Sequence, residues 1–190
     1  MNVKFLDHTG LRTAAVAAKM CIGKEMDGWD MNAGDIAPFL HTIIKRGHES
    51  VLEHVVYVYQ VKGISRACLQ QVARHRHLSL SVKSTRWALK KHGEYFVPDE
   101  FDSEDKEAYK KSVSRTLKEV EVIREKYGND VAKYLLPECL QTDMILTVNL
   151  RELRLIYKLR TAPNAMREFR QLAQAMVACL PEDEQGLVRA

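Results

Sequence analysis

The sequence predicts a single α+β domain over residues 1–190. A chain of this length can bury one ordinary hydrophobic core without further support. β-branched and aromatic residues dominate several short segments, and longer segments with helical periodicity lie between and after them. Because no internal repeat, low-complexity segment or linker interrupts the chain, one domain accounts for all of it.

In the first half, strands and helices are expected to alternate. The opening segment MNVKFLD predicts a strand, and the Ala-rich segment LRTAAVAAKMC predicts a helix. The segment DIAPFLHTIIKRG predicts an amphipathic helix that Asp35 caps and Gly47 ends. The partly alternating run EHVVYVYQVKG predicts a strand of about ten residues. Ser65 is then expected to cap a helix that ends at Gln71 or Arg74, and an irregular stretch should follow.

In the second half, helices are expected to dominate. EYFVP predicts a short strand or extended segment, and DMILTVN predicts another strand. The segment from Ser103 to Gly128 predicts a long helix, acidic at its start and basic towards its end, as the helix dipole favours. From about Leu150 to Leu180 the pattern is helical, and Pro163 should divide it into two helices at an angle. The polar tail PEDEQGLVRA is expected to be frayed.

The composition is that of a soluble globular protein, with 46% hydrophobic and 28% charged residues. The net charge of +4 permits contact with a polyanion but is milder than that of a dedicated nucleic-acid-binding domain. The four cysteines are scattered without a CxxC pair, which argues against a zinc site or a disulfide framework and favours a reducing, cytoplasmic setting. Neither a signal peptide nor a membrane-spanning segment is expected, because no apolar run approaches the roughly 20 residues that a span needs.

The stretch QVARHRHLSLSVKSTRW, from Gln71 to Trp87, concentrates cations and hydroxyls in a segment without glycine. Guanidinium groups bind phosphate through planar, bidentate contacts, and hydroxyls add short hydrogen bonds. Arg74 and Arg86 on either side of Ser84 therefore indicate a phosphate site on an irregular loop. The same composition would also suit a solvated basic face that pairs with the acidic helix further along the chain. Residue chemistry alone leaves both interpretations open.

A second cationic segment, NLRELRLIYKLR, lies further along the chain. Its Arg151 and Arg160 would stand about 180° apart around a continuous helix. They would therefore serve different ligands, or pockets shared between chains. The other interpretation is that these cations only pair with Glu152 on the helix surface.

Two common site motifs, one for zinc and one for phosphate, are absent from the sequence. GHESVLEH suggests the zinc-protease pattern H-E-x-x-H, but the residue four after His48 is Leu52, so no metal site is expected. The nine glycines are isolated and form neither a G-x-G-x-x-G turn nor a P-loop. If the protein binds a nucleotide, side chains must hold it.

At these motifs the sequence resembles the flavin-dependent thymidylate synthases. Their signature, R-H-R followed by seven residues and S-x-R, is present as Arg74-His75-Arg76 and Ser84-Thr85-Arg86. GHESVLEH is similar to the family's G-H-E-[ST]-x-x-E-H. Further family elements recur at Leu136-Pro137, Thr142, Thr147 to Arg151, and Leu159-Arg160. The resemblance runs from about Val16 to Arg170.

The resemblance implies a central, largely antiparallel sheet flanked by helices, in a homotetramer with active sites at subunit interfaces. It implies that FAD, once reduced, accepts the one-carbon unit of methylenetetrahydrofolate and passes it to dUMP to give dTMP, with NADPH as the reductant. The flavin would carry the chemistry and the protein would supply positioning and electrostatics. That suits a sequence with no evident Cys or Ser–His nucleophile. Small molecules are the expected partners, and neither nucleic acid nor a membrane is expected.

The resemblance also assigns individual residues. The expected flavin contacts are His48, Ser50, Glu53, Arg74, His75, Arg76, Asn149 and Arg151. The expected dUMP contacts are Gln71, Arg74, Ser84, Thr85, Arg86, Lys133 and Arg160. Among the latter, Arg74 would reach across from a neighbouring chain, and the expected catalytic residues are Ser84, Arg86 and Arg160. One face of the helix that carries Arg151 and Arg160 would then meet the flavin, and the opposite face the nucleotide.

Several positions depart from the family pattern. Lys133 stands where the family usually has Arg, which keeps the charge but loses the bidentate fork. Ser81 and Val82 replace the family's Asn and Glu, and that Glu normally lies at the nucleotide. Leu155 occupies a position near the flavin that is often Asn or His, and the family's A-Q-x-E-I-R segment is AMREFR at 165–170.

These departures leave several functions open. The chain could be a thymidylate synthase, a relative that methylates another uracil nucleotide such as UMP, or a weakened enzyme. A hypothesis from a different class is a non-catalytic binder of nucleotide or nucleic acid built on the same basic loop.

Overall fold

A computed structural model describes residues 1–24, 29–88 and 94–190 of the chain. Within them the chain forms an antiparallel sheet with the strand order β1-β2-β4-β3. The strands are β1 (Asn2–His8), β2 (Val56–Ser65), β3 (Leu78–Val82) and β4 (Gln141–Asn149). The expectation of an α+β fold with a central antiparallel sheet flanked by helices is therefore confirmed.

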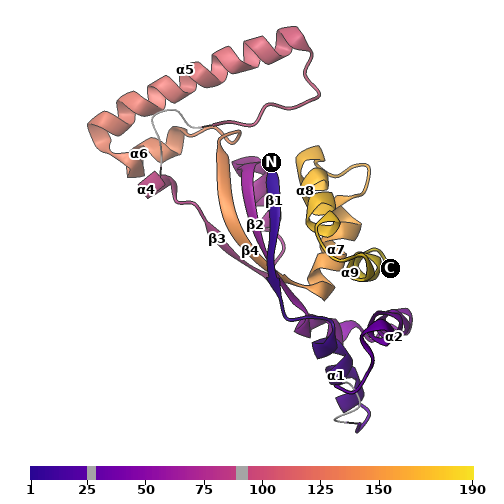
Figure 1. Ribbon diagram of the computed structural model, residues 1–190. Coiled ribbons are helices and arrows are strands. Elements are labelled where there is room, and N and C mark those ends of the chain that lie inside the picture. The colour runs from indigo at the N-terminus through magenta and orange to yellow at the C-terminus, as the bar shows by residue number, and fades with distance from the viewer. Residues whose placement is uncertain (25–28, 89–93) are drawn as a thin grey trace.

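Helices lie on one face of the sheet and beyond both of its ends (Figure 1). The helices are α1 (Arg12–Met20), α2 (Ala33–Lys45), the 3₁₀ helix η1 (Glu49–His54), α3 (Arg66–Val72), α4 (Thr85–Ala88), α5 (Ser103–Tyr127), α6 (Asn129–Ala132), the 3₁₀ helix η2 (Lys133–Leu135), α7 (Leu150–Arg160), α8 (Arg167–Ala178) and α9 (Glu182–Arg189). Figure 1 shows α7, α8 and α9 beside the sheet, α1 and α2 below it, and α5 above it with α4 and α6. No helix of the described residues is both long and apolar enough to span a membrane.

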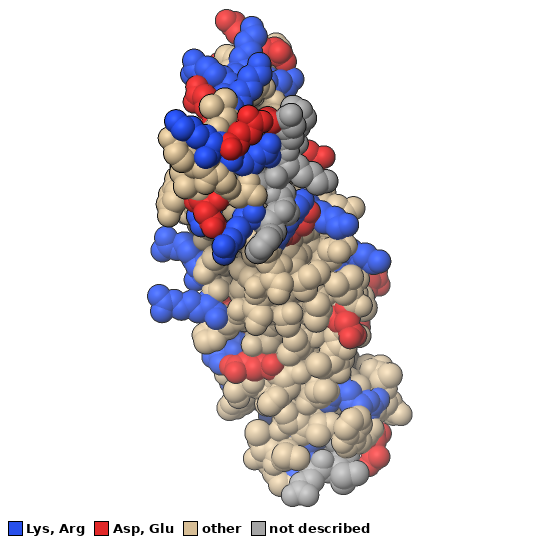
Figure 2. All heavy atoms as spheres, turned by 90° about the vertical axis from the view of Figure 1, so that its left-hand side faces the viewer, with Lys and Arg blue, Asp and Glu red and all other residues tan. Residues whose placement is uncertain are grey.

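The core lies between the sheet and the helices on its covered face. Tyr57 and Tyr59 of β2 and Leu146 and Val148 of β4 alternate with residues of the opposite face and are buried. On the opposite face, Val58 of β2, Thr147 of β4 and Ser79 of β3 lie side by side in cross-strand register. Figure 2 looks onto that side of the molecule and shows a largely uncharged centre, with charged side chains of both signs at its upper end and along its edges.

Most expected elements are confirmed within a few residues. Ser65 caps α3, because its Oγ accepts a hydrogen bond from the backbone nitrogen of Cys68 at 2.9 Å. Gly47 follows α2 with a φ of +75°, which is the left-handed conformation that glycine adopts most readily. The segment 94–98 is extended and forms one isolated bridge between Tyr95 and Leu140. Two separate helices, α7 and α8, lie on either side of Pro163 as expected.

Three local expectations are wrong. The stretch after α3 is not irregular, because residues 78–82 form β3 at the sheet edge and α4 follows it. Helix α2 begins at Ala33 with Asn32 at its N-cap, so Asp35 lies in its first turn instead of capping it. The tail is not frayed, because α9 buries Leu187 and Val188 in the core.

Candidate functional site

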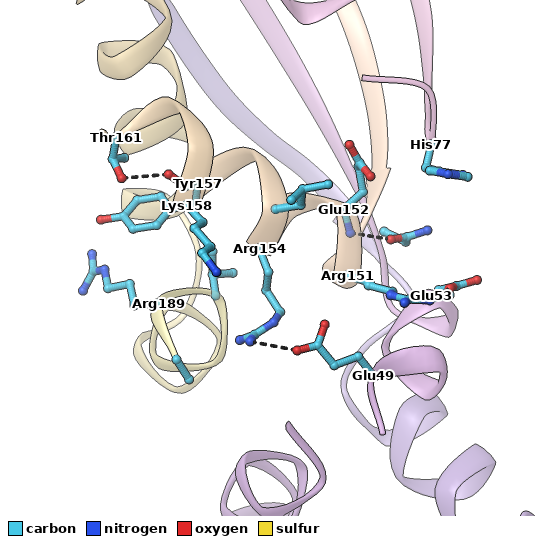
Figure 3. A pocket seen from close by; sticks show the side chains of 14 residues that line it. Glu49, Glu53, His77, Arg151, Glu152, Arg154, Tyr157, Lys158, Thr161 and Arg189 are labelled. Carbon is cyan, nitrogen blue, oxygen red and sulfur yellow. Dashed lines mark hydrogen bonds and ion pairs between the residues drawn. The ribbon is translucent and has the colours of Figure 1, made fainter. Parts of the chain in front are cut away.

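A pocket of about 860 Å³ lies between η1, the junction of β4 with α7, and α9 (Figure 3). Three expected flavin contacts from separate parts of the sequence line it: Glu53, Asn149 and Arg151. Asn149 also fixes the start of α7, because its Oδ1 accepts a hydrogen bond from the backbone nitrogen of Glu152 at 2.8 Å. This cap determines where the following arginines leave the helix.

Two arginine–glutamate pairs tie α7 to η1 at this pocket. Arg151 Nη1 lies 2.6 Å from Glu53 Oε1, and Arg154 Nη2 lies 3.3 Å from Glu49 Oε1. Figure 3 shows the latter pair as a dashed line, with Lys158 extending from the same helix. The Arg151–Glu53 pair is about half exposed on both sides, so an anionic ligand can compete for the guanidinium at small cost.

A smaller pocket of about 360 Å³ adjoins the first and shares Glu53 and Asn149 with it. Arg76 lines this second pocket, beside the start of β3. The side chains of His48, Ser50 and Arg74 are exposed, but they line neither of these two pockets. Within one chain, four of the expected flavin contacts (Glu53, Arg76, Asn149 and Arg151) therefore line the two adjoining pockets.

His75 departs most clearly from the expected set, because its side chain points inwards. Only 7% of this residue is exposed, and its Nδ1 lies 2.8 Å from Glu152 Oε1. Its Nε2 accepts a hydrogen bond from Arg160 Nε at 3.0 Å. An expected flavin contact and an expected nucleotide contact are thus bonded directly to each other. Glu152 pairs with this histidine and not with the arginines of its own helix.

The expected nucleotide contacts form two groups. Ser84, Thr85, Arg86 and Lys133 lie together near α6, where Arg86 Nε and Lys133 Nζ approach the carboxylate of Asp130 at 3.2 and 3.5 Å. Gln71, Arg74 and Arg160 belong to α3, the turn after it and the end of α7. The extended strand β3 runs between Arg74 and Ser84 and spans roughly 15 Å, so Arg74 and Arg86 belong to opposite ends of this strand within a single chain.

The chemistry of the surrounding residues is consistent with positioning and not with nucleophilic attack by Cys68. Burial raises the pKa of the Cys68 thiol, the nearby Glu168 raises it further, and Arg160 lowers it by less. Such a thiol is a poor nucleophile at neutral pH. The described residues contain no cluster of three or more His, Cys, Asp or Glu side chains that could hold a metal ion.

Comparison with known proteins decides the family. The family model for "Thymidylate synthase complementing protein" matches residues 4–182. A flavin-dependent thymidylate synthase from Wolinella succinogenes is 36% identical over 202 aligned positions, which cover 98% of this chain and 97% of the relative. The chain belongs to the flavin-dependent thymidylate synthase family.

Solved structures agree with this membership. A flavin-dependent thymidylate synthase of Helicobacter pylori, crystallised with FAD and dUMP, superimposes with a TM-score of 0.85 at 30% identity, covering 100% of this chain and 98% of that one. A UMP/dUMP methylase from Streptomyces cacaoi, bound with 5-bromo-dUMP, superimposes with a TM-score of 0.81 over 98% of this chain and 93% of that one. Its identity is 19%, so this second likeness concerns the fold alone.

Sequence reasoning about the flavin-dependent thymidylate synthase family missed part of the pocket. Arg154 and Lys158 were recognised only as helix-surface charges, although their spacing of three and seven residues from Arg151 places all three on one side of α7. Arg189 was missed because the tail was expected to be frayed, and no short-range signal marks it. The interpretation in which Glu152 pairs with cations of its own helix is wrong, and its bond to His75 was missed because the two residues are 77 positions apart.

Proposed function

We propose that this protein is a flavin-dependent thymidylate synthase that methylates dUMP reductively to dTMP. FAD is its cofactor, methylenetetrahydrofolate is the carbon donor, and NADPH is the reductant. The observation that carries the proposal is the meeting of Glu53, Asn149 and Arg151 around one pocket in a chain that matches the family over nearly its whole length. We further propose that the protein acts in the cytoplasm, in keeping with its four unpaired cysteines.

The residues around the pocket suit a flavin dinucleotide. The volume of about 860 Å³ is within the range of cofactor sites. Arg151 and Arg76 offer guanidinium donors for the diphosphate, and the side-chain amide of Asn149 offers a hydrogen-bonding group. When bound, the flavin supplies the redox and one-carbon chemistry. The protein's own side chains would bind the flavin, orient it and exclude water from the site.

The separation of the nucleotide contacts favours active sites at subunit interfaces. Within one chain, β3 separates Ser84 and Arg86 from Arg74 and Arg160. A second copy could bring the missing group to each site, with Arg74 entering from the neighbour. The side of the sheet opposite α7, α8 and α9 (Figure 1) is largely uncharged at its centre (Figure 2), and such a surface is suited to burial between copies. The proposed assembly is a homotetramer.

The decisive experiment measures tritium release from 5-tritiated dUMP, beside 5-tritiated UMP, with FAD, NADPH and methylenetetrahydrofolate present. Tritium is released only if the proton at carbon 5 leaves, so the assay tests the chemistry and the choice of nucleotide together. We expect release from dUMP. Release from UMP alone would favour the related methylase, and a protein that takes up no FAD and binds polynucleotide with a steep salt dependence would favour the non-catalytic binder.

Two substitutions test the nucleotide contacts. Arg86→Ala and Arg160→Ala should each raise the dUMP concentration needed for half-maximal release by about tenfold or more, because each removes a charge-assisted contact to the substrate. Arg115→Ala, on the exposed surface of α5, is the matched control and should behave as the unmodified protein. An unchanged dependence on dUMP in both test variants would refute the nucleotide assignments.

A further inference from the structure

Glu152 carries a buried carboxylate and is not among the expected flavin, nucleotide or catalytic residues. It lies in the first turn of α7, and its side chain is 6% exposed. Figure 3 shows its carboxylate pointing away from the Arg154–Glu49 pair at the pocket wall. Its partner is the His75 ring, which is equally buried. A buried charge is costly unless it is paired and hydrogen-bonded, so the geometry of this contact is informative.

The hydrogen bonds of His75 fix the position of its proton. An arginine side chain carries only donors, so the bond from Arg160 Nε requires His75 Nε2 to accept. An accepting Nε2 carries no proton, which leaves the proton of the neutral ring on Nδ1. That N–H is directed at Glu152 Oε1, 2.8 Å away. The imidazole is therefore a neutral bridge between a carboxylate and a guanidinium.

His75 contacts the guanidinium group of Arg160 at its edge, and the Phe169 ring contacts the face of the same group. Arg160 Cζ lies 4.8 Å from the centroid of the Phe169 ring, which itself packs edge-on against His75 at 5.8 Å. Phe169 is 1% exposed and belongs to the hydrophobic core cluster, so neighbouring core residues hold its ring in place. Within the described part of the chain, neither terminal nitrogen of Arg160 has a hydrogen-bond or ion-pair partner. Both are thus available for a ligand in a fixed orientation.

We propose that Glu152 is a positioning residue that, acting through the tautomer of His75, fixes the direction in which Arg160 presents its terminal nitrogens to the uracil nucleotide. The assignment of the nucleotide rests on the proposed function, whereas the bridge itself does not. Without the carboxylate, a buried Nδ1–H would have no acceptor. The ring would then move its proton to Nε2, where it faces the donor of Arg160 and displaces the guanidinium.

Nuclear magnetic resonance of the ¹⁵N-labelled protein without ligands tests the bridge first. The Nδ1-protonated tautomer of His75, assigned by its loss in His75→Gln, is expected in the unmodified protein together with a slowly exchanging Arg160 Nε–H. Glu152→Ala should convert the ring to the Nε2-protonated tautomer and abolish the protected Arg160 signal. Glu152→Gln should retain both signals, because its amide oxygen can still accept from Nδ1.

Nucleotide affinity tests the consequence. Glu152→Ala should weaken dUMP binding by about tenfold, which is typical of residues that orient a ligating side chain, and Glu152→Gln should recover most of the loss. In an Arg160→Ala background the Glu152→Ala substitution should have no further effect on dUMP affinity. Glu184→Ala is the matched control, because Glu184 is also buried with an oxygen 3.2 Å from a histidine Nδ1, that of His8. It should lower stability without changing dUMP affinity.

Two results would overturn the proposal. One is an Nε2-protonated His75 in the unmodified protein. The other is a Glu152→Ala variant with an unchanged His75 tautomer and Arg160 signal. If the unmodified protein bound no dUMP, the proposed nucleotide site would fail, while the ligand-free spectra would still decide whether Glu152 orders Arg160.

Discussion

Asp143 Oδ1 accepts a hydrogen bond at 3.0 Å from the backbone nitrogen of Gly63, at the point where the register between β2 and β4 shifts. Gly63 has a φ of +72°, a conformation that L side chains rarely adopt. The second carboxylate oxygen of Asp143 lies 3.2 Å from Lys83 Nζ, just after β3. One side chain of β4 therefore joins the two strands on either side of it, close to the expected nucleotide contact Ser84.

We expect Asp143→Asn to lower stability in a pH-dependent way. Burial raises the pKa of the Asp143 carboxyl, but the hydrogen bonds from Gly63 and Lys83 outweigh it and hold the pKa below its ordinary value. The contribution to stability is then present above the carboxyl's ordinary pKa and is lost as the pH falls through the folded-state pKa. The side chain is 40% exposed, so the free energy of unfolding should fall by no more than about 1 kcal/mol near neutral pH.

Urea unfolding of Asp143→Asn and of the unmodified protein, from neutral to acidic pH, measures this effect. The difference in unfolding free energy should shrink as the pH is lowered. Glu119→Gln, on the exposed surface of α5, should show no such trend. A difference that stays constant over the whole range would contradict the assigned electrostatic role.

Ser65→Ala should be among the more destabilising single substitutions outside the pockets. Ser65 Oγ caps α3 and also donates to Glu168 Oε2 at 2.5 Å, and Glu168 Oε1 accepts from the Ser65 backbone nitrogen at 2.6 Å. The substitution removes the cap and one of two donors to a buried carboxylate. The expected loss is about 2–4 kcal/mol in the free energy of unfolding, measured in urea. Ser114→Ala, on exposed α5, should cost little, and a loss below about 1 kcal/mol at Ser65 would show that Glu168 finds another donor.

The fold was largely predictable because its main signals are local. Alternation marks β2 and β4, the Ser65 cap marks α3, and Pro163 marks the break between α7 and α8. The edge strand β3 was missed although residues 78–82 alternate, because the surrounding cations and hydroxyls dominated the interpretation. The bounds of a single domain over 1–190 stay a prediction.

The site was less predictable because its decisive contacts are long-range. Spacing on a helix correctly placed Arg151 and Arg160 on opposite sides of α7, where they contact Glu53 and His75. No local pattern shows that His75 turns inwards, because its two partners lie 77 and 85 residues away. The expected flavin, nucleotide and catalytic roles of all the named site residues stay predictions.

The packing of the C-terminal helix α9 against the core can be tested by substitution. Leu187 of α9 is fully buried in the core cluster, and the backbone oxygen of the same residue accepts a hydrogen bond from Arg154 Nη1. Leu187→Ala should therefore lower the free energy of unfolding by about 2–5 kcal/mol, as expected for a truncated core leucine. Thermal unfolding monitored by circular dichroism is sufficient to detect this. Gln185→Ala, in the same helix but partly exposed, is the comparison, and equal midpoints for the two variants would indicate a frayed tail after all.

Val82 departs from the family pattern in a way that the structure explains. Its side chain lies on the face of β3 that packs against the core, opposite Met144, whereas Ser81 is exposed on the other face. An apolar residue at position 82 therefore contributes to packing. Val82→Glu should cost about 1–3 kcal/mol of unfolding free energy, because a carboxylate would be partly desolvated there without an assigned partner.

Ser114→Glu is the control for Val82→Glu, since it adds the same charge on the exposed surface of α5, away from the open face of the sheet. It should change the free energy of unfolding by about 0.5 kcal/mol or less. The ratio of tritium release from dUMP and UMP should be the same in both variants as in the unmodified protein, because position 82 serves the core. A shift of that ratio in Val82→Glu alone would instead place position 82 at the nucleotide, as in the family pattern, and would make Val82 a determinant of substrate choice.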